Sequence, residues 1–169
     1  MSSLLRLPKD GSADPESIAP LPDGAYHVLE NTLYWHNGVS AVRFDKETET
    51  MQELELRQFF DSGDIPSDVD YTVGDGNHIY GAKIGCSEMV GVSWDGTDPW
   101  LSTLEREGYV SGRVTMALSE SHVFCGGGSG GSTAGKIYRW SREGGEAEEF
   151  ASCPDYSDNL RLFSCSSQV

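Results

Sequence analysis

One segment, from Gly130 to Lys136, has the spacing of a phosphate-binding loop, G-x-x-x-x-G-K. Such a loop binds phosphate through backbone amides and the lysine, holds magnesium with a following Ser or Thr, and begins a helix. Here Ile137 follows the lysine, and the alternation from Ile137 to Trp140 is typical of a β-strand. We therefore predict that the Gly-rich run from Gly126 to Ser132 is part of a flexible loop between two strands, with no bound cofactor.

The aspartates of one acidic segment are the main candidates for a metal site: Asp61, Asp64, Asp68, Asp70 and Asp75. A calcium-binding EF-hand loop needs Gly at its sixth position and Glu at its twelfth. Counted from Asp68, these positions hold Val73 and Ile79, so the motif fails. A calcium site of another kind remains an alternative, but we predict a solvated connector and no metal site.

The histidines and serines show no arrangement of a nucleophile and a base. His78 and His122 each precede the apolar pair of a predicted strand, which indicates a structural role such as capping a turn. Ser129 and Ser132 lack the G-x-S-x-G turn that exposes the nucleophile of many hydrolases. We therefore predict no catalytic residues.

Aromatic residues are better candidates, for binding rather than for catalysis. Exposed Trp and Tyr side chains on loops form platforms for sugars and central contacts of protein interfaces. The candidate binding residues are Trp35, His36, Trp100 and Tyr109. His36 is included because it follows Trp35 at the predicted end of a strand.

These candidates belong to a pattern of short strands that occurs three times. The second strand of each copy contains Leu33-Tyr34-Trp35, Ile79-Tyr80-Gly81 or Val123-Phe124-Cys125. Their central aromatic residues, at positions 34, 80 and 124, are 46 and 44 residues apart. This period is typical of four-stranded propeller blades.

The third strand of each copy ends on an aromatic residue and a turn former: Phe44-Asp45, Trp94-Asp95 and Trp140-Ser141. Because they recur in register, we predict that Phe44, Trp94 and Trp140 lie in the core between blades. The one segment that favours a helix runs from Glu47 to Phe60, where the apolar residues partly follow helical spacing.

The domain organisation follows from these repeats. We predict an all-β fold with blades at about residues 23–60, 66–106 and 112–153, and the first strand of a fourth at 158–169, all within a partial propeller of residues 23–169. Residues 1–22, which contain four prolines, are predicted to form an extended N-terminal arm with one strand from Leu4 to Leu7. A β-sandwich or barrel of the same short strands is the alternative.

Several segments resemble known β-propeller repeats. Lys136 to Glu146 resembles the third strand and turn of a tryptophan–aspartate (WD) repeat, and Ser93-Trp94-Asp95-Gly96 contains the Trp-Asp pair. Asn31 to Trp35 is similar to YWTD-type propellers. The resemblance covers Tyr26 to Val169, without the Gly-His opening of WD repeats or the double glycine of kelch repeats. It implies a rigid scaffold whose loops bind proteins, sugars or small ligands, and it implies no reaction.

About three blades do not close a ring of ~4–8 blades, and a blade buries its faces only against its neighbours. We therefore expect a protein partner, a second copy or a longer parent chain to cover the open blades. The predicted function is that of a non-catalytic protein–protein interaction scaffold. A glycan-binding, lectin-like propeller is the alternative, and a propeller-type hydrolase or lyase is the least favoured.

Charge limits the partners. The 169 residues include 27 acidic and 12 basic side chains, which gives a net charge of −15. Such a charge repels nucleic acid and anionic membranes but suits a basic protein partner. No segment approaches the ~20 apolar residues of a membrane span, and the first residues are too weakly apolar for a signal peptide. We expect a cytoplasmic protein, or a secreted one if a leader was removed.

The cysteines at positions 86, 125, 153 and 165 form no C-x-x-C motif, and no histidine lies at zinc-finger spacing from them. We therefore predict reduced, structural thiols. A bridge between Cys153 and Cys165 is the alternative for an oxidising compartment.

Overall fold

The structure is a computed structural model, and it describes residues 2–6, 12, 14–21, 26–29, 31–36, 39–60, 71–104, 111–129 and 135–152. In these residues the regular elements are β-strands and two short 3₁₀ helices. The predicted all-β class is therefore confirmed. Within the described residues, no helix has the length and apolar character needed to cross a membrane.

The elements follow one another in four groups. The first group is β1 (Ser2–Arg6) and β2 (Glu16–Leu21). The second is β3 (Tyr26–Leu29), β4 (Thr32–His36), β5 (Ser40–Asp45), β6 (Thr50–Glu55) and the 3₁₀ helix η1 (Arg57–Phe59). The third is β7 (Tyr71–Gly74), β8 (His78–Ala82), the 3₁₀ helix η2 (Ile84–Cys86), β9 (Glu88–Ser93) and β10 (Trp100–Thr103). The fourth is β11 (Ser111–Leu118), β12 (His122–Ser129), β13 (Lys136–Ser141) and β14 (Glu148–Ser152).

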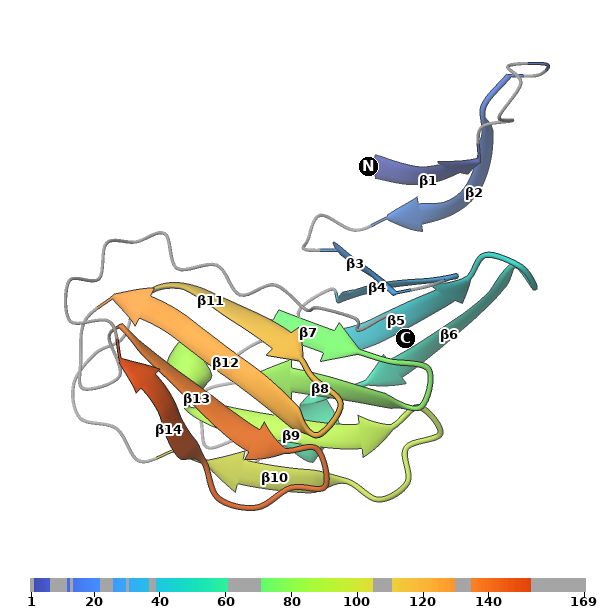
Figure 1. Cartoon of the computed structure of the whole chain (residues 1–169). Helices are drawn as coiled ribbons and strands as arrows, with labels where there is room; N and C mark the ends of the chain where they lie inside the picture. Colours follow the sequence, from blue (N-terminus) through green and yellow to red (C-terminus); the bar gives the residue numbers. More distant parts are fainter. Residues whose placement is uncertain are drawn as a thin grey trace.

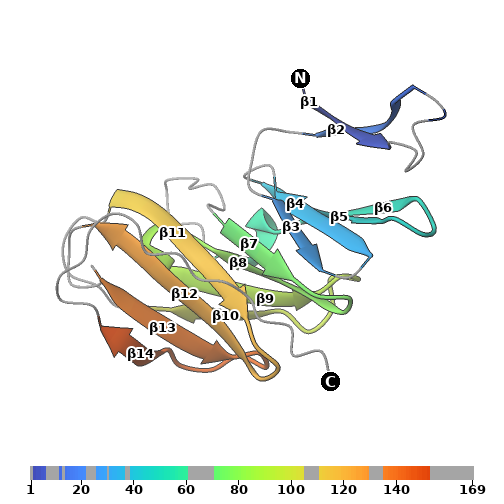
Figure 2. The same ribbon diagram turned by 45° about the horizontal axis from the view of Figure 1, so that its top comes forward.

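Each group forms its own antiparallel sheet, with neighbouring strands paired in chain order (Figure 1). We call β3–β6 the first sheet, β7–β10 the second sheet and β11–β14 the third sheet. The sheets are separate because, among the described strands, β6 does not pair with β7 and β10 does not pair with β11. The two-stranded sheet of β1 and β2 stands apart from the other three in both views (Figures 1 and 2).

Polar side chains at equivalent positions stabilise the turns that follow the third strand of each sheet. Asp45 Oδ1 accepts the backbone N–H of Thr48 at 2.8 Å, Asp95 Oδ1 accepts that of Thr97 at 3.0 Å, and Ser141 Oγ accepts that of Glu143 at 3.2 Å. The backbone N–H of Thr48 lowers the pKa of Asp45. In the same way, the hydroxyl and backbone N–H of Thr97 lower the pKa of Asp95.

Two apolar clusters lie between the sheets. The cluster between the first and second sheets contains Tyr34, Ile79 and Trp94, and the Tyr34 and Trp94 rings stack with 5.9 Å between their centres. The cluster between the second and third sheets contains Tyr80, Met89 and Trp140. Burial of these large side chains supplies most of the free energy that holds neighbouring sheets together.

The three aromatic residues predicted to be core are indeed buried. Phe44, Trp94 and Trp140 have exposed fractions of 3%, 4% and 0%. Trp94 and Trp140 each lie between two sheets, whereas Phe44 packs with Trp35 and Val42 on the opposite face of the first sheet. Burial is therefore confirmed for all three, and a position between two sheets is confirmed for Trp94 and Trp140 but not, within the described residues, for Phe44.

The segment expected to favour a helix is mostly strand. Residues Thr50–Glu55 form β6, and only the 3₁₀ helix η1 follows. Gln52 and Leu54 are half-buried, and Met51, Glu53 and Glu55 are exposed, which is the two-residue period of a strand. Pairing with β5 overrides the partial helical spacing.

The Gly-rich run is also more regular than predicted. Strand β12 continues to Ser129, and Gly126 pairs with both Thr115 and Ile137 in neighbouring strands. A Cβ atom at Gly126 would lie 3.1 Å from Cγ1 of Ile137, so this position is tightly packed. The predicted flexible loop is therefore wrong for residues 126–129, and residues 130–134 lie outside the described part of the chain.

The N-terminal arm contains two strands where one was expected. β1 starts two residues before the predicted Leu4, and it pairs with β2 over residues 16–21. The predicted partial strand at 158–169 lies outside the described residues.

The prediction of reduced thiols is wrong for two of the four cysteines. Cys86 at the end of η2 forms a disulfide with Cys125 of β12, with 6.0 Å between the Cα atoms. Both residues are buried in the cluster between the second and third sheets, at 1% and 0% exposed. The two cysteines are 39 positions apart, and only the packing of one sheet on the next brings them together. Cys153 and Cys165 lie outside the described residues.

Candidate functional site

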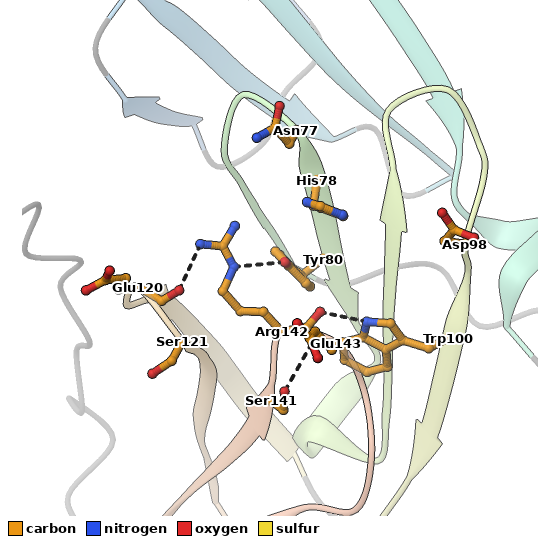
Figure 3. A pocket seen from close by; sticks show the side chains of 10 residues that line it. All are labelled: Asn77, His78, Tyr80, Asp98, Trp100, Glu120, Ser121, Ser141, Arg142 and Glu143. Carbon is orange, nitrogen blue, oxygen red and sulfur yellow. Dashed lines mark hydrogen bonds between the residues drawn. The ribbon is translucent and has the colours of Figure 1, made fainter.

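Four turns gather at one end of the second and third sheets and surround a cleft of about 770 Å³ (Figure 3). They join β7 to β8, β9 to β10, β11 to β12 and β13 to β14. The lining residues are Asn77, His78, Tyr80, Asp98, Trp100, Glu120, Ser121, Ser141, Arg142 and Glu143. Both sheets contribute to the cleft, so no single repeat contains it.

Arg142 lies at the centre of the cleft and contacts both sheets (Figure 3). Its Nε donates a hydrogen bond to the Tyr80 hydroxyl at 3.0 Å, and its Nη1 donates to the carbonyl oxygen of Glu120 at 3.4 Å. Its Nη2 forms an ion pair with the Asp75 carboxylate. All three guanidinium nitrogens therefore have partners within the chain.

The Tyr80 ring supports this guanidinium from one side. The guanidinium carbon of Arg142 lies 5.6 Å from the ring centre, which is within cation–π range. Burial raises the pKa of Tyr80 to about 12, so the phenol stays neutral and can accept the Arg142 hydrogen bond at neutral pH. The His78 ring stacks on Tyr80 with 6.2 Å between their centres, and the equivalent His122 ring lies at the same distance from Phe124 but is tilted by 50°.

Asp75 organises the turn between β7 and β8. Its Oδ1 accepts the backbone N–H groups of Asn77 at 2.7 Å and His78 at 2.8 Å. Its other oxygen, Oδ2, pairs with Arg142. One carboxylate thus closes a turn of the second sheet and binds the third sheet.

The first sheet holds the same turn from the other side. Arg43 of β5 donates from Nη1 to the carbonyl oxygen of Gly76 at 2.6 Å. The indole N–H of Trp94, whose ring lies 5.0 Å from the Arg43 guanidinium carbon, donates to the carbonyl oxygen of Asp75 at 3.0 Å. The turn at residues 75–77 therefore connects all three sheets.

We expect Asp75→Asn to lower the free energy of unfolding by about 1–3 kcal/mol. The amide keeps an oxygen for the turn N–H groups but leaves the half-buried Arg142 guanidinium without its counter-charge. Urea unfolding followed by circular dichroism measures the change. Asp95→Asn is the matched control, because Asp95 closes a similar turn and no arginine or lysine is paired with it among the described residues. Equal losses in both variants would show that the ion pair adds nothing.

Trp100 forms a wall of the cleft and is held firmly. Its indole N–H donates to the carbonyl oxygen of Arg142 at 3.0 Å, and its ring centre lies 6.2 Å from that of Tyr80. A Cβ atom at Gly91 would lie 2.4 Å from the Trp100 ring, and one at Gly144 would lie 2.9 Å from it. Only glycine at these two positions leaves room for the indole, so much of its ring is covered by the chain itself.

The rim of the cleft is acidic. The side chains of Asp98, Glu120 and Glu143 are exposed around it. Arg142 is the one arginine or lysine among the described lining residues, and its charge is balanced by Asp75. The cleft therefore carries a surplus of about three negative charges at neutral pH.

The structure separates the sequence-predicted binding residues. Trp100 lines the cleft, whereas Trp35 is 3% exposed and packs against Val42 and Phe44. The burial of Trp35 fits a packing role better than a binding role. Tyr109 lies outside the described residues.

His36 is half-buried at the end of β4, and its ring lies 6.3 Å from that of Tyr71. Burial lowers the pKa of His36, which favours the neutral imidazole. Neither ring nitrogen has a hydrogen-bond partner among the described residues. His36 belongs to the junction of the first and second sheets and not to the cleft.

Sequence reasoning missed Arg142 as a site residue, and it considered Asp75 only as a possible calcium ligand and not as the partner of Arg142. Both lie in turns that the pattern of glycine and acidic residues predicts, so the local signal was present. The two residues come together only because the second and third sheets pack on each other. They are 67 positions apart in the chain, and no local pattern indicates that they are neighbours.

The other chemical candidates are occupied or lie outside the described residues. Lys136 begins β13, and its Nζ pairs with Glu149 Oε2 at 2.8 Å. Asp61, Asp64, Asp68 and Asp70 fall in residues that the structure does not describe. Among the residues that it does describe, no group of three or more His, Cys, Asp or Glu side chains is arranged to hold a metal ion.

Comparisons with known proteins bear only on the fold. No family model matches the chain, and no curated protein matches it. A chain from the solved S. cerevisiae complex of a Dbp5 variant with Nup159, a Gle1 variant, IP6 and ADP is similar, with a TM-score of 0.51 and 12% sequence identity. The match covers 87% of this chain and 42% of that one. This chain therefore spans less than half of the structure that it resembles, and the likeness concerns the arrangement of strands alone.

Proposed function

We propose that the three four-stranded sheets are successive blades of an incomplete β-propeller. The strands of each sheet pair in chain order, and the first strands of the second and third sheets, β7 and β11, lie side by side. Tyr34 and Tyr80 pack toward the following sheet, whereas Trp94 and Trp140 pack toward the preceding one. Equivalent positions thus face the same way in successive sheets, as expected of blades around one axis.

We further propose that the chain is a non-catalytic protein-binding module whose cleft takes a basic segment of a partner protein. The observation that carries this proposal is the acidic rim formed by Asp98, Glu120 and Glu143 around a cleft whose arginine is already neutralised. A lysine or arginine side chain would find carboxylates to pair with there. The net charge of −15 would also attract a basic partner at a distance.

A protein partner is a better fit than a glycan. A lectin-like platform needs an open aromatic ring face for the sugar. Trp35 is buried, and the Trp100 ring is covered by Gly91 and Gly144. The disulfide between Cys86 and Cys125 also favours an oxidising compartment, and hence the secreted location over the cytoplasmic one.

Peptide binding tests the proposed function. A fluorescently labelled peptide with two lysines and two arginines is titrated with the full chain and followed by anisotropy, beside a peptide carrying norleucine and citrulline at the same places. We expect binding of the basic peptide only, weakening with salt. The triple variant Asp98→Asn, Glu120→Gln, Glu143→Gln should bind about tenfold more weakly, since each exposed charge pair contributes about 0.5 kcal/mol.

The matched control removes the same charge elsewhere. Asp14, Glu53 and Glu55 are exposed and belong to other parts of the chain, so Asp14→Asn, Glu53→Gln, Glu55→Gln lowers the net negative charge equally. We expect less than about a twofold effect from this control, because only long-range attraction changes. Equal weakening in both triple variants, or equal binding of the neutral peptide, would contradict a specific cleft.

A further inference from the structure

The third sheet has one face on which no described sheet packs, and the β12–β14 part of that face is partly exposed. Cross-strand pairing places Arg139 opposite Phe124 and Glu148 next to Arg139, so these three residues share that face; Ala117, on the other side of Phe124, is buried at 6% exposed. Phe150 is 54% exposed, and its ring contacts the Phe124 ring edge-on at 5.1 Å. We call Phe124, Arg139, Glu148 and Phe150 the outer face of the third sheet.

The same position is covered in the two preceding sheets. Tyr34 and Tyr80, which correspond to Phe124, are 2% and 1% exposed because the next sheet packs on them. Phe124 is only half-buried, and no described sheet follows the third one. The outer face therefore has the side chains of a sheet-packing surface without a described sheet against it.

We propose that a second copy of this chain packs on this face, third sheet against third sheet, in a two-fold dimer. Charge is the reason for choosing a second copy. Arg139 Nη2 lies 2.7 Å from Glu148 Oε2, so the outer face has no net charge although the chain carries −15. Two such chains repel each other over most of their surfaces, and this neutral, apolar patch is where the repulsion is weakest.

The face also complements itself. A two-fold axis brings the same patch of both copies together. Where one residue of the first copy contacts a different residue of the second, the same contact forms again with the roles of the two copies exchanged. The apolar centre of Phe124 and Phe150 can pack on its own copy, and Arg139 of each chain can pair with the partner's Glu148. Each Arg139 would then pair with Glu148 of the other copy instead of its own Glu148. Every charge keeps a partner while the aromatic rings are buried.

Sedimentation equilibrium of the full chain tests this dimer. We expect a monomer–dimer equilibrium for the natural sequence, and Phe150→Asp should weaken it by about thirtyfold or more, as for a central aromatic contact. Met51→Asp is the matched control, because Met51 is 57% exposed on an outer strand of the first sheet. A monomer at all concentrations overturns the proposal, and so does a dimer that survives Phe150→Asp or dissociates equally in Met51→Asp.

Charge reversal separates a second copy from any other occupant. Arg139→Glu makes the outer face acidic and Glu148→Arg makes it basic, so each variant alone should be monomeric. An equimolar mixture of the two should form a heterodimer, because the opposite faces attract. Absence of association in the mixture overturns the proposal. The result is independent of the cleft, which the peptide titration tests on different residues.

Discussion

Removal of the disulfide through the double substitution Cys86→Ala, Cys125→Ala is expected to lower the free energy of unfolding by about 4 kcal/mol. The bridge closes a loop between positions 39 residues apart, and restricting a loop of that length in the unfolded chain accounts for this magnitude. Both sulfur atoms are buried between the second and third sheets, so the variant also loses apolar contacts. Urea unfolding followed by circular dichroism measures the difference.

The other two cysteines provide a matched control. Cys153→Ala, Cys165→Ala removes the same number of cysteines and leaves the Cys86–Cys125 bridge intact, and we expect less than about 1 kcal/mol of change. Addition of a phosphine reductant to the natural sequence should reproduce the loss seen in Cys86→Ala, Cys125→Ala. An unchanged unfolding midpoint in that variant would mean that the contact between the second and third sheets does not depend on the bridge.

Trp140→Ala is expected to destabilise the chain by about 3–5 kcal/mol. Trp140 is 0% exposed in the cluster between the second and third sheets. Its indole N–H donates to the hydroxyl of Ser102 in β10 at 3.1 Å, which joins the two sheets directly. Truncation leaves a cavity and a buried hydroxyl without its donor. The free energy of unfolding is measured in urea, as for the disulfide.

Two smaller changes divide this effect into its parts. Trp140→Phe keeps most of the ring volume and loses the hydrogen bond, and Ser102→Ala loses the hydrogen bond alone. We expect each to cost about 1–2 kcal/mol, clearly less than the alanine variant. If Trp140→Ala lowers the free energy of unfolding by less than about 1 kcal/mol, this contact contributes little to the packing of the second sheet on the third.

The repeat predicts the strands well because strand formation is largely local. Alternation of apolar and polar residues and the turn formers Asp45, Asp95 and Ser141 act within a few positions, and the structure has turns at all three. The equivalence of His78 and His122 indicates a structural role. In the structure, their backbone N–H groups are accepted by Asp75 and Ser119 across short turns.

The wrong secondary-structure predictions concern segments where the local sequence pattern favours one conformation and a tertiary contact stabilises another. Residues 50–55 have apolar spacing that also suits a helix, but pairing with β5 makes them a strand. The glycines from position 126 favour a loop, yet β12 uses them where Ile137 of the neighbouring strand packs closely. In both cases a neighbouring strand supplies the hydrogen bonds and contacts that decide the conformation.

The amino-acid sequence by itself determined that the chain is all-β, where most of its strands and turns lie, and that the repeated aromatic residues Phe44, Trp94 and Trp140 are buried. These properties depend on the period of side chains along the backbone and on turn chemistry. Only the tertiary structure decided that Cys86 bonds to Cys125, that Asp75 pairs with Arg142, and that four distant turns enclose one acidic cleft. Such contacts arise when the apolar faces of whole sheets are buried against each other, and residues that meet there need have no regular spacing in the chain.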